Sequence, residues 1–508
     1  MKMNIKLIFL FLLVMAGLRA NSQVYNVKSF GACGNGKNDD TQAIQAAIEK
    51  AALARKGSVY FPTGTYLIGS FTKTPVYLEN YCLYLRSNIS LKGDGKTSVI
   101  KIASHLFDKA DSSANAHLFY GKVLHNLQFE NLMINMNGNN NLTPEGVKKN
   151  GTAIFIKNSN NVIIKNITVK NCAGRNMILI LGKGKNLLIE NSSFINGGYN
   201  VGTSVINKFQ DDFSFLYSEW DSSNIVNNII KQENIKIALR NYTGGIEIHG
   251  SYSKALKNKV TGCFPGLYIR SSWYAIKNIS VEDNKFLNCV KGILILVLNP
   301  ISNVTIHNNE IQLTESLKVR ELVQAGIEIP NGNSLTHSPQ EQNNAALTNI
   351  SIKNNIITSV VADNSDVKTA GMVLHSLQQS IIKNNTIKGM NYGGIVLQGS
   401  KWGIDVLSIT GNTISGFKYN TDEMAICAYL MITSIYSAKD INFPGLKNIY
   451  VTKNNFIFNT DAAIRSNSIA FKRKFTGAYV AAPTIDQIHF KDNNFSNKKE
   501  GIKMIKTD

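Results

Sequence analysis

The sequence predicts an all-β fold, a parallel β-helix, and three observations lead to this prediction. A glycine opens a short strand of alternating apolar residues six times, for example Gly245-Ile246-Glu247-Ile248 and Gly266-Leu267-Tyr268-Ile269. A second strand that runs into asparagine usually follows, as in Asn303-Val304-Thr305-Ile306-His307-Asn308-Asn309. The first phrase recurs after 21, 26, 34, 45 and 23 residues. Alternation at period two indicates strands, and a unit this short buries its apolar face only by stacking on the next unit.

The first 22 residues (1–22) have the pattern of a secretory signal peptide. Lys2 and Lys6 precede an apolar run that extends from Leu7 to Ala16, and Ala20-Asn21-Ser22 supplies small residues at the exit. The run is too short for a confident membrane span, and no cysteine lies beside the cleavage region to accept a lipid. We therefore expect a secreted or periplasmic protein without stable membrane insertion.

Residues 23–126 are expected to form an N-terminal cap and the first coils. Asp40 or Thr41 is suited to cap a short helix that covers the open end of the solenoid. The apolar face of that helix consists of Ile44, Ala47, Ile48 and Ala51. Asp39 and Asp40 are therefore assigned to the start of the helix and not to catalysis.

Residues 127–508 are expected to form the remaining coils with loop insertions. The glycine before each first strand would permit a tight bend, and the asparagines would adopt left-handed backbone angles and form rows along the coil axis. Four segments break the rhythm and are expected to be loops on the coils: 197–235, 312–347, 358–370 and 415–447. Loops of this kind often build the binding site of a solenoid.

Three of the six cysteines are expected to form a row of free, buried thiols rather than disulfides. Cys263 and Cys289 share the frame C-x-x-G-[LI]-x-I, and Cys172 holds a similar position before a strand. Equivalent positions in successive coils stack, so these side chains fit a row in the core. A bridge between adjacent coils is the alternative.

The formal net charge of +20 favours a polyanionic partner. It falls to +17 once Lys2, Lys6 and Arg19 leave with the signal peptide. The lysines are spread over the coils without basic runs or an aromatic-plus-basic motif, which argues against nucleic acid. An acidic polysaccharide is the expected partner, and nothing in the sequence indicates an oligomeric state.

The segment from Val24 to Ile48 resembles the entry motif of the pectate lyase-like β-helix superfamily. It reads VYNVKSFGACGNGKNDDTQAIQAAI, and the continuation GSVYFPTGTYL, from Gly57 to Leu67, matches too. This resemblance implies a right-handed parallel β-helix and a polysaccharide as substrate. Members of the superfamily include polygalacturonases, exo-β-1,3-glucanases, alginate epimerases, polysaccharide lyases and phage tailspike depolymerases. The polygalacturonase motifs are only partly present, and the epimerase signature Y-G-F-D-P-H-E is absent. No catalytic residue is therefore assigned from the resemblance.

The candidate site is derived from the register of the coils instead. A shift of 21 residues places Glu247 beside Tyr268 and His249 beside Arg270, all at outward positions. Stacked strands lie about 4.8 Å apart, so the four side chains would form one compact patch, unless they simply satisfy one another at the surface. The substrate-binding candidates are Lys157, on the same face in an earlier coil, and Asp211, Asp212 and Trp220 in the segment that precedes the patch. Ordinary solvation in a loop is the competing interpretation for the two aspartates.

Three functions fit this patch. In a lyase that acts by β-elimination on a uronic acid polymer, Arg270 with Lys157 would neutralise the carboxylate, and His249 or Tyr268 would move protons. In a glycoside hydrolase, Glu247 would pair with Asp211 or Asp212. The third function is a non-catalytic, carbohydrate-binding solenoid. No cofactor is required; the sequence has no Cys/His cluster with zinc spacing and no D-x-D-x-D loop for Ca2+, although some β-helix lyases bind calcium.

Overall fold

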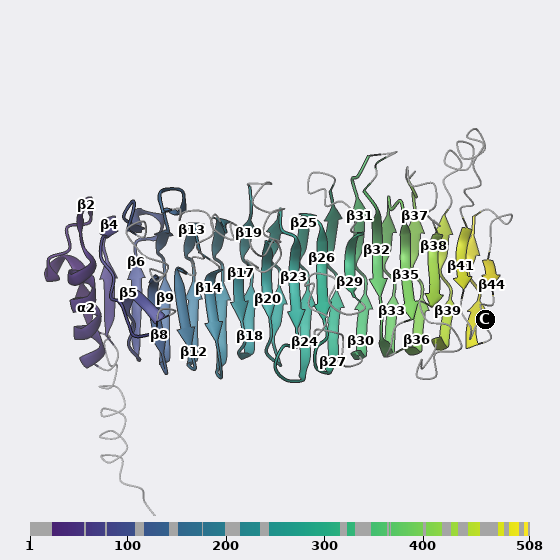
Figure 1. The fold of residues 1–508 in the computed structure, drawn as a ribbon, viewed down its shortest axis with the longest axis horizontal. Helices are drawn as coiled ribbons and strands as arrows, with labels where there is room; N and C mark the ends of the chain where they lie inside the picture. Colours follow the sequence, from purple (N-terminus) through teal and green to yellow (C-terminus); the bar gives the residue numbers. More distant parts are fainter. Residues whose placement is uncertain are drawn as a thin grey trace, which may run out of the picture.

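The computed structural model describes most of the chain after the first 22 residues (Figure 1). The described residues are 23–54, 57–76, 79–106, 116–141, 151–174, 176–198, 214–233, 243–314, 323–330, 347–362, 365, 367–399, 403–418, 428–434, 446–457, 476–481, 487–496 and 502–505. Within these residues the strands stack along one long axis, with helix α2 (Thr41–Leu53) at one end. The predicted parallel β-helix with a short N-terminal helix is confirmed.

Three parallel sheets run the length of the solenoid, and each coil contributes one strand to each sheet. Sheet A contains β1 Val24–Asn26, β3 Ser58–Phe61, β6 Ile89–Gly93, β9 His125–Glu130, β12 Asn160–Lys165, β15 Lys185–Glu190, β18 Asp221–Val226, β21 Lys254–Leu256, β24 Ile276–Glu282, β27 Ile301–His307, β30 Leu347–Lys353, β33 Leu377–Lys383, β36 Ile404–Thr410, β39 Leu446–Thr452 and β42 Ile488–Lys491. Sheet B contains β2 Asn35–Asp39, β4 Gly64–Ile68, β7 Ser98–Ile102, β10 Met133–Asn135, β13 Thr168–Cys172, β16 Ser193–Gly197, β19 Ile229–Lys231, β22 Lys259–Thr261, β25 Lys285–Cys289, β28 Glu310–Leu313, β31 Ile356–Ser359, β34 Thr386–Lys388, β37 Thr413–Ser415, β40 Asn455–Ile457 and β43 Asn494–Phe495.

Sheet C is formed by the strands that the glycine phrase predicts, together with their counterparts in earlier and later coils. It contains β5 Asn80–Tyr84, β8 Ala116–Lys122, β11 Ile154–Lys157, β14 Asn176–Leu181, β17 Ser214–Ser218, β20 Gly244–Ile248, β23 Pro265–Arg270, β26 Lys291–Leu296, β29 Gln324–Ile329, β32 Thr369–Leu374, β35 Gly393–Gly399, β38 Ala428–Ser434, β41 Thr476–Ala481 and β44 Ile502–Ile505. Ile246 pairs with Leu267 and Leu267 with Ile293, so the expected inner row exists. All three side chains are buried, and the core is one continuous apolar column.

The glycines before the sheet C strands serve close packing rather than a bend. Gly266 is not among the glycines with positive φ, so its backbone does not require glycine for a turn. A Cβ atom there would lie 2.4 Å from a ring carbon of Phe286 and 2.8 Å from the carbonyl oxygen of Gly292. The expectation of a tight bend is therefore corrected: any side chain at this position would collide with sheet B and with the next coil.

Asparagines form two ladders along the coil axis, as predicted. The buried ladder lies between sheets A and B, and its members are Asn228, Asn258, Asn284, Asn309, Asn355, Asn385, Asn412, Asn454 and Asn493. At each step the backbone N–H and the side-chain amide of one asparagine both donate to the Oδ1 of the next. The preceding residue often has a left-handed backbone, for example Asn308 with φ 55°. The exposed ladder lies at the start of the sheet A strands.

Helix α2 closes the N-terminal end, and its buried residues include Ile44, Ala47, Ile48 and Ala51, as expected. The capping differs from the prediction. Asp40 is the N-cap residue but makes no side-chain cap bond, because its carboxylate accepts the backbone N–H groups of Cys33 and Gly34. The carboxylate of Asp39 instead accepts the N–H of Thr41 at 2.9 Å. Both aspartates therefore fasten the cap.

The loop assigned to 197–235 is wrong for most of the described part of that segment. Residues 214–231 form a full coil of strands β17, β18 and β19. Strand β29 likewise lies inside the segment 312–347, and strand β38 inside 415–447. The cysteines that the structure describes are free, and Cys172, Cys263 and Cys289 are buried as predicted. Burial raises the pKa of the Cys172 and Cys289 thiols to about 12.

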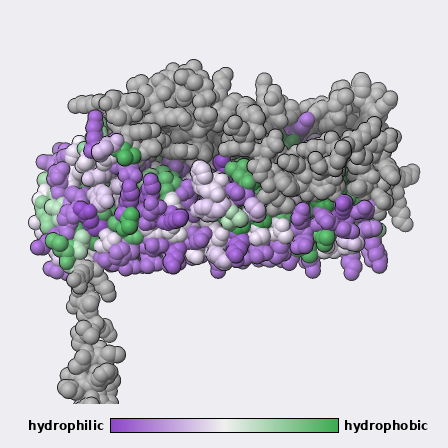
Figure 2. All heavy atoms as spheres, turned by 60° about the horizontal axis from the view of Figure 1, so that its bottom comes forward, coloured by the Kyte–Doolittle hydropathy of each residue, from purple (hydrophilic) through white to green (hydrophobic). Residues whose placement is uncertain are grey.

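The outer surface in Figure 2 is mainly hydrophilic with scattered hydrophobic residues. In the described part of the chain, no helix is both long and apolar enough to span a membrane.

Candidate functional site

A row of ionisable side chains lies at the C-terminal ends of the sheet C strands. Lys122 of β8 pairs with Lys157 of β11, and Lys157 pairs with Leu181 of β14. In later coils, Glu219, His249 and Arg270 take the same outward position. The residue just before Glu219 pairs with the residue just before His249, which in turn pairs with the residue just before Arg270. We call Lys122, Lys157, Glu219, His249 and Arg270 the charged row. The row points away from the core, since the residue that precedes each member on its strand is buried and side chains alternate between the two faces of a strand.

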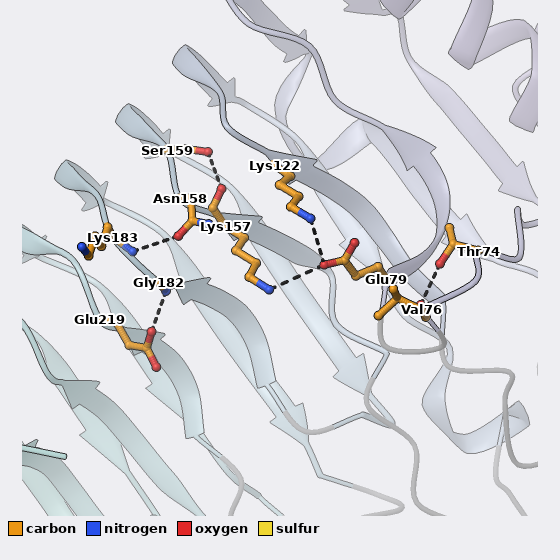
Figure 3. Close-up of polar contacts among 10 residues, drawn as sticks. All are labelled: Thr74, Val76, Glu79, Lys122, Lys157, Asn158, Ser159, Gly182, Lys183 and Glu219. Atoms are coloured by element: carbon orange, nitrogen blue, oxygen red, sulfur yellow. Dashed lines mark hydrogen bonds and ion pairs between the residues drawn. The ribbon is translucent and has the colours of Figure 1, made fainter. Parts of the chain in front are cut away.

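The N-terminal end of the charged row is held by Glu79 (Figure 3). A carboxylate oxygen of Glu79 lies 3.5 Å from Nζ of Lys122 and 3.6 Å from Nζ of Lys157. Burial acts to raise the pKa of Glu79, but the nearby Tyr120 hydroxyl and the charges of both lysines outweigh it and leave the pKa lowered. Glu79 therefore stays ionised and holds the two ammonium groups side by side, with more than a third of each lysine side chain exposed.

Glu219 is fixed in the middle of the row by two donors. The backbone N–H of Gly182 donates to one carboxylate oxygen at 2.5 Å (Figure 3), and the Tyr217 hydroxyl donates to the other at 3.1 Å. The side chain is half-buried. Glu219 therefore presents an oriented carboxylate between the lysines and the later members of the row.

A buried polar relay crosses the row at the next two coils. Ser214 donates to Oε2 of Glu247 at 2.6 Å, and Oε1 of Glu247 lies 2.8 Å from Nε2 of His249. The other ring nitrogen of His249, Nδ1, is 3.2 Å from the hydroxyl of Ser272. The relay is almost closed to solvent, because Glu247 is 2% exposed and His249 is 3% exposed. Only Ser272, at the end of the relay, is partly open to water.

The charge state of Glu247 follows from its neighbours. Burial acts to raise its pKa, but the hydrogen bond and charge of His249, the Ser214 hydroxyl and the charge of Arg270 together lower it. Glu247 is therefore a carboxylate that accepts the Nε2–H of His249 and so orients the ring. The other ring nitrogen, Nδ1, faces Ser272 and is then the one suited to accept a proton.

The structure brings the four candidate catalytic residues together. Glu247 pairs with Tyr268, and Arg270 ends the same strand as Tyr268, one coil after His249. Tyr268 packs against Leu294 and Leu296 and is 9% exposed, whereas Arg270 is half-buried. The expectation of an open surface patch is corrected for Glu247, His249 and Tyr268, because these three side chains are buried.

The candidate substrate-binding residues lie in different parts of the structure. Lys157 lies on the expected face, but four strand spacings, about 19 Å, separate it from Arg270, so the two cannot neutralise one carboxylate. Trp220 is fully buried and its indole N–H donates to the carbonyl of Leu181, so it belongs to the core and not to a sugar-binding wall. Asp211 and Asp212 lie outside the described residues.

Sequence reasoning missed Glu79, Lys122, Glu219, Ser214 and Ser272. Glu219 was placed in a presumed loop, and Glu79 lies in a turn that no repeat marks. Lys122 ends a strand that carries no glycine phrase, so the repeat does not mark it. Its place beside Lys157 is seen only in the structure. Among the residues that the structure describes, no three His, Cys, Asp or Glu side chains are grouped to hold a metal ion.

Comparison with known sequences gives one family and several partial relatives. The model of a family described as rhamnogalacturonase A/epimerase, pectate lyase-like, matches residues 24–294. The chain is 36% identical over 181 residues to plasmin and fibronectin-binding protein A of Streptococcus pneumoniae, which covers 34% of this chain and 24% of that protein. It is 37% identical over 117 residues to a mannuronan C5-epimerase of Azotobacter vinelandii, with 23% and 11% covered. It is 38% identical over 120 residues to alginate lyase 7 of the same organism, with 23% and 13% covered. The chain thus spans a quarter or less of these relatives.

Two solved structures share the fold. The A-module of a mannuronan C-5 epimerase from Azotobacter vinelandii superimposes with a TM-score of 0.59 at 19% identity, over 86% of this chain and 99% of that chain. A tailspike protein variant of E. coli bacteriophage HK620, in complex with a pentasaccharide, superimposes with a TM-score of 0.63 at 15% identity, over 95% of this chain and 80% of that chain. At these identities the likeness concerns the fold alone.

Proposed function

Because this chain belongs to the rhamnogalacturonase A/epimerase, pectate lyase-like family, we propose that it is a secreted enzyme that acts on an acidic polysaccharide. The polymer lies along the charged row of sheet C, and the enzyme cleaves it by β-elimination at a uronic acid unit. The relatives named as alginate lyase and mannuronan C5-epimerase support a uronate polymer. The signal-peptide pattern of the first 22 residues supports export.

The single observation that carries the proposal is the arrangement of the charged row. Its five side chains extend over six strand positions, about 24 Å, which is a length suited to a polymer rather than to one small molecule. Lys122 and Lys157 are partly exposed cations at one end and Arg270 is the cation at the other. Cations spaced along one line match the repeated carboxylates of a uronate chain.

The residues divide the chemistry of β-elimination between them. Arg270 neutralises the substrate carboxylate, which lowers the barrier to removing the adjacent C5 proton. His249, oriented by Glu247, accepts that proton by way of Ser272: the partly exposed hydroxyl oxygen takes the C5 proton while its own proton passes to Nδ1 of His249. The electron pair forms the C4–C5 double bond, and the glycosidic oxygen on C4 leaves with a proton from Tyr268. Lys122 and Lys157 bind carboxylates of sugar units farther along the polymer, since about 19 Å separates Lys157 from Arg270.

C5 epimerisation is the second candidate, and the mannuronan C5-epimerase relative favours it. Both reactions begin with removal of the C5 proton. An epimerase then returns a proton to the opposite face of the same carbon, whereas a lyase expels the oxygen on C4. The same roles for Arg270 and His249 serve either outcome.

Hydrolysis fits the described geometry less well. A glycosidase needs a carboxylic acid with a raised pKa as proton donor beside a second carboxylate. Glu247 has a lowered pKa and is 2% exposed. Glu219 is partly exposed but both of its oxygens already accept hydrogen bonds.

Arg270→Ala tests the proposal on a panel of alginate, polygalacturonate and a neutral β-glucan. We expect the wild type to form unsaturated uronate ends, seen by ultraviolet absorbance, and the variant to be slower by roughly 10²–10³. Lys285→Ala, which removes an exposed ion pair with Glu310 far from sheet C, is the matched control and should keep full activity. Reducing ends without unsaturation would favour hydrolysis. Binding without any reaction would indicate a carbohydrate-binding solenoid.

A further inference from the structure

The exposed asparagine ladder is interrupted beside the charged row. Its rungs are side-chain amide hydrogen bonds between consecutive coils, such as Asn186 to Asn161 at 2.8 Å and Asn303 to Asn278 at 3.0 Å. Between Asn186 and Asn278, the same register positions are held by Ser222 and Tyr252. Two asparagines of the ladder are therefore replaced by a hydroxyl and an aromatic ring, and the three rungs between Asn186 and Asn278 are missing.

Tyr252 occupies a backbone conformation that favours asparagine or glycine. Its φ of 58° is in the left-handed region, where a tyrosine meets steric resistance from its own Cβ. The ring is 48% exposed, and Nζ of Lys277 lies 5.8 Å from its centroid. A strained, exposed aromatic residue in place of a hydrogen-bonding asparagine does not stabilise the fold. Backbone strain of this kind concentrates at binding sites.

The interruption forms one side of an open pocket of about 420 Å³. The pocket is lined by Ser222 and Tyr252 together with Lys183, Lys185 and Asp221. Both lysine side chains are exposed, and their ammonium groups have no ion pair among the described residues. The Asp221 carboxylate accepts the N–H of Ser251 at 2.7 Å, which fixes its orientation in the wall. The size is suited to a single ring of a ligand.

The pocket adjoins the charged row through the turns that lead from sheet C to sheet A, because Glu219 and His249 of the row come three residues before Ser222 and Tyr252 of the pocket. Burial, followed by the negative charges of Glu219 and Asp221, raises the pKa of Tyr274 in the turn after β23. Trp273, in the same turn, is 72% exposed. Exposed aromatic rings therefore lie in the corresponding turns of two neighbouring coils.

We infer that the break in the exposed ladder is a sugar subsite that takes one carboxylate-bearing unit of the polysaccharide beyond the charged row. The face of that sugar stacks on Tyr252, its carboxylate pairs with Lys183 or Lys185, and a hydroxyl donates to Asp221. The inference rests on the proposed function for the identity of the polymer, but it concerns binding and not reaction. Its test therefore uses oligosaccharide affinity as the readout.

Tyr252→Asn restores the asparagine that neighbouring coils carry. The probes are reduced tetrasaccharides of galacturonate, mannuronate and uncharged glucose, titrated calorimetrically at low salt. We expect about tenfold weaker binding of a uronate tetrasaccharide, the size of one lost contact, together with a higher melting temperature because strain is relieved and a rung is regained. The double variant Lys183→Ala/Lys185→Ala should weaken the same probe while leaving any glucose binding unchanged.

Val406→Asn is the matched control. Val406 holds the same ladder position in a distant coil, also with a left-handed backbone, φ 54°, and an exposed side chain. It should raise stability and leave affinity unchanged. Unchanged affinity in Tyr252→Asn, equal loss in both asparagine variants, or failure of every uronate probe to bind the wild type would overturn the subsite. Binding without turnover would contradict the proposed reaction but leave the subsite supported.

Discussion

His249 holds the buried carboxylate of Glu247 in place as much as it is suited to proton transfer. The two side chains are 2.8 Å apart and nearly inaccessible to water, so each satisfies the other. An outward position on the sheet does not here mean an exposed side chain. Residue substitutions in this relay should therefore affect folding as well as activity.

His249→Ala should lower the free energy of unfolding by about 3–5 kcal/mol, because it leaves a buried carboxylate without its principal partner. Urea denaturation at neutral pH measures the change. Lys285→Ala, at an exposed ion pair of 2.6 Å, should cost only about 0–1 kcal/mol. Equal, small effects of both substitutions would show that Glu247 is not charged in the folded protein.

Glu247 also predicts the direction of a pH effect on stability. Because its pKa is lower in the folded state than when unfolded, its ionisation stabilises the fold above the unfolded value of about 4.3. This contribution is lost as the pH falls through the folded pKa. Wild-type stability should fall more steeply than that of Glu247→Gln between about pH 4.5 and pH 3. Parallel curves would contradict a lowered pKa.

The sequence predicts the neighbours of these residues better than their burial. The interval of 21 residues correctly places Glu247 beside Tyr268, because register in a solenoid follows from the repeat. Burial depends on what packs over the outer face, which the repeat does not encode. Trp220 illustrates the same limit: its neighbours in sequence are polar, yet it fills the core.

The buried asparagine ladder runs from coil to coil along the solenoid axis and fixes the corner between sheets A and B. Asn309 donates to Asn355 through its backbone and side chain, donates to the carbonyl of Val281, and accepts two hydrogen bonds from Asn284. Five hydrogen bonds therefore meet at one buried side chain and its N–H. A single rung binds three consecutive coils together.

Asn309→Ala should destabilise the protein by about 1–3 kcal/mol or more, since it leaves buried donors on Asn284 unsatisfied. Asn303→Gly is the comparison in the same coil: it removes an exposed rung but keeps a residue that accepts φ of 56°. Its cost should be about 0.5 kcal/mol. Equilibrium unfolding of both variants decides, and a larger loss from the exposed rung would contradict this account.

The strands were predictable where the repeat is explicit and not where it is degraded. Strand β17 has the sequence Ser-Phe-Leu-Tyr-Ser and lacks the opening glycine, so its coil was assigned to a loop. In the structure, Phe215 holds the register position of Gly245 and is buried in the core. Helix α2 was predictable because its apolar face has the helical period, whereas its capping by Asp39 depends on contacts with a distant strand.

The whole molecule carries a net charge of +20, and we expect the cations of the charged row to attract a polyanion. Affinity for alginate or polygalacturonate should weaken steeply as salt rises from about 0.05 M to 0.5 M, because exposed lysine charges are screened. The double variant Lys122→Ala/Lys157→Ala should bind more weakly at low salt and depend less on salt. Titration of both proteins measures this. Salt-independent binding would argue for a neutral glycan.

The fate of the hydrogen on C5 tests the central claim most directly. A uronate polymer is incubated with the enzyme in heavy water, and the C5 position and the chain ends are followed by NMR. The account predicts that wild type removes the C5 hydrogen, giving either unsaturated ends or deuterium at C5, and that Arg270→Ala slows the loss by roughly 10²–10³. Chains shortened with every C5 hydrogen retained would contradict it, because cleavage would then be hydrolysis.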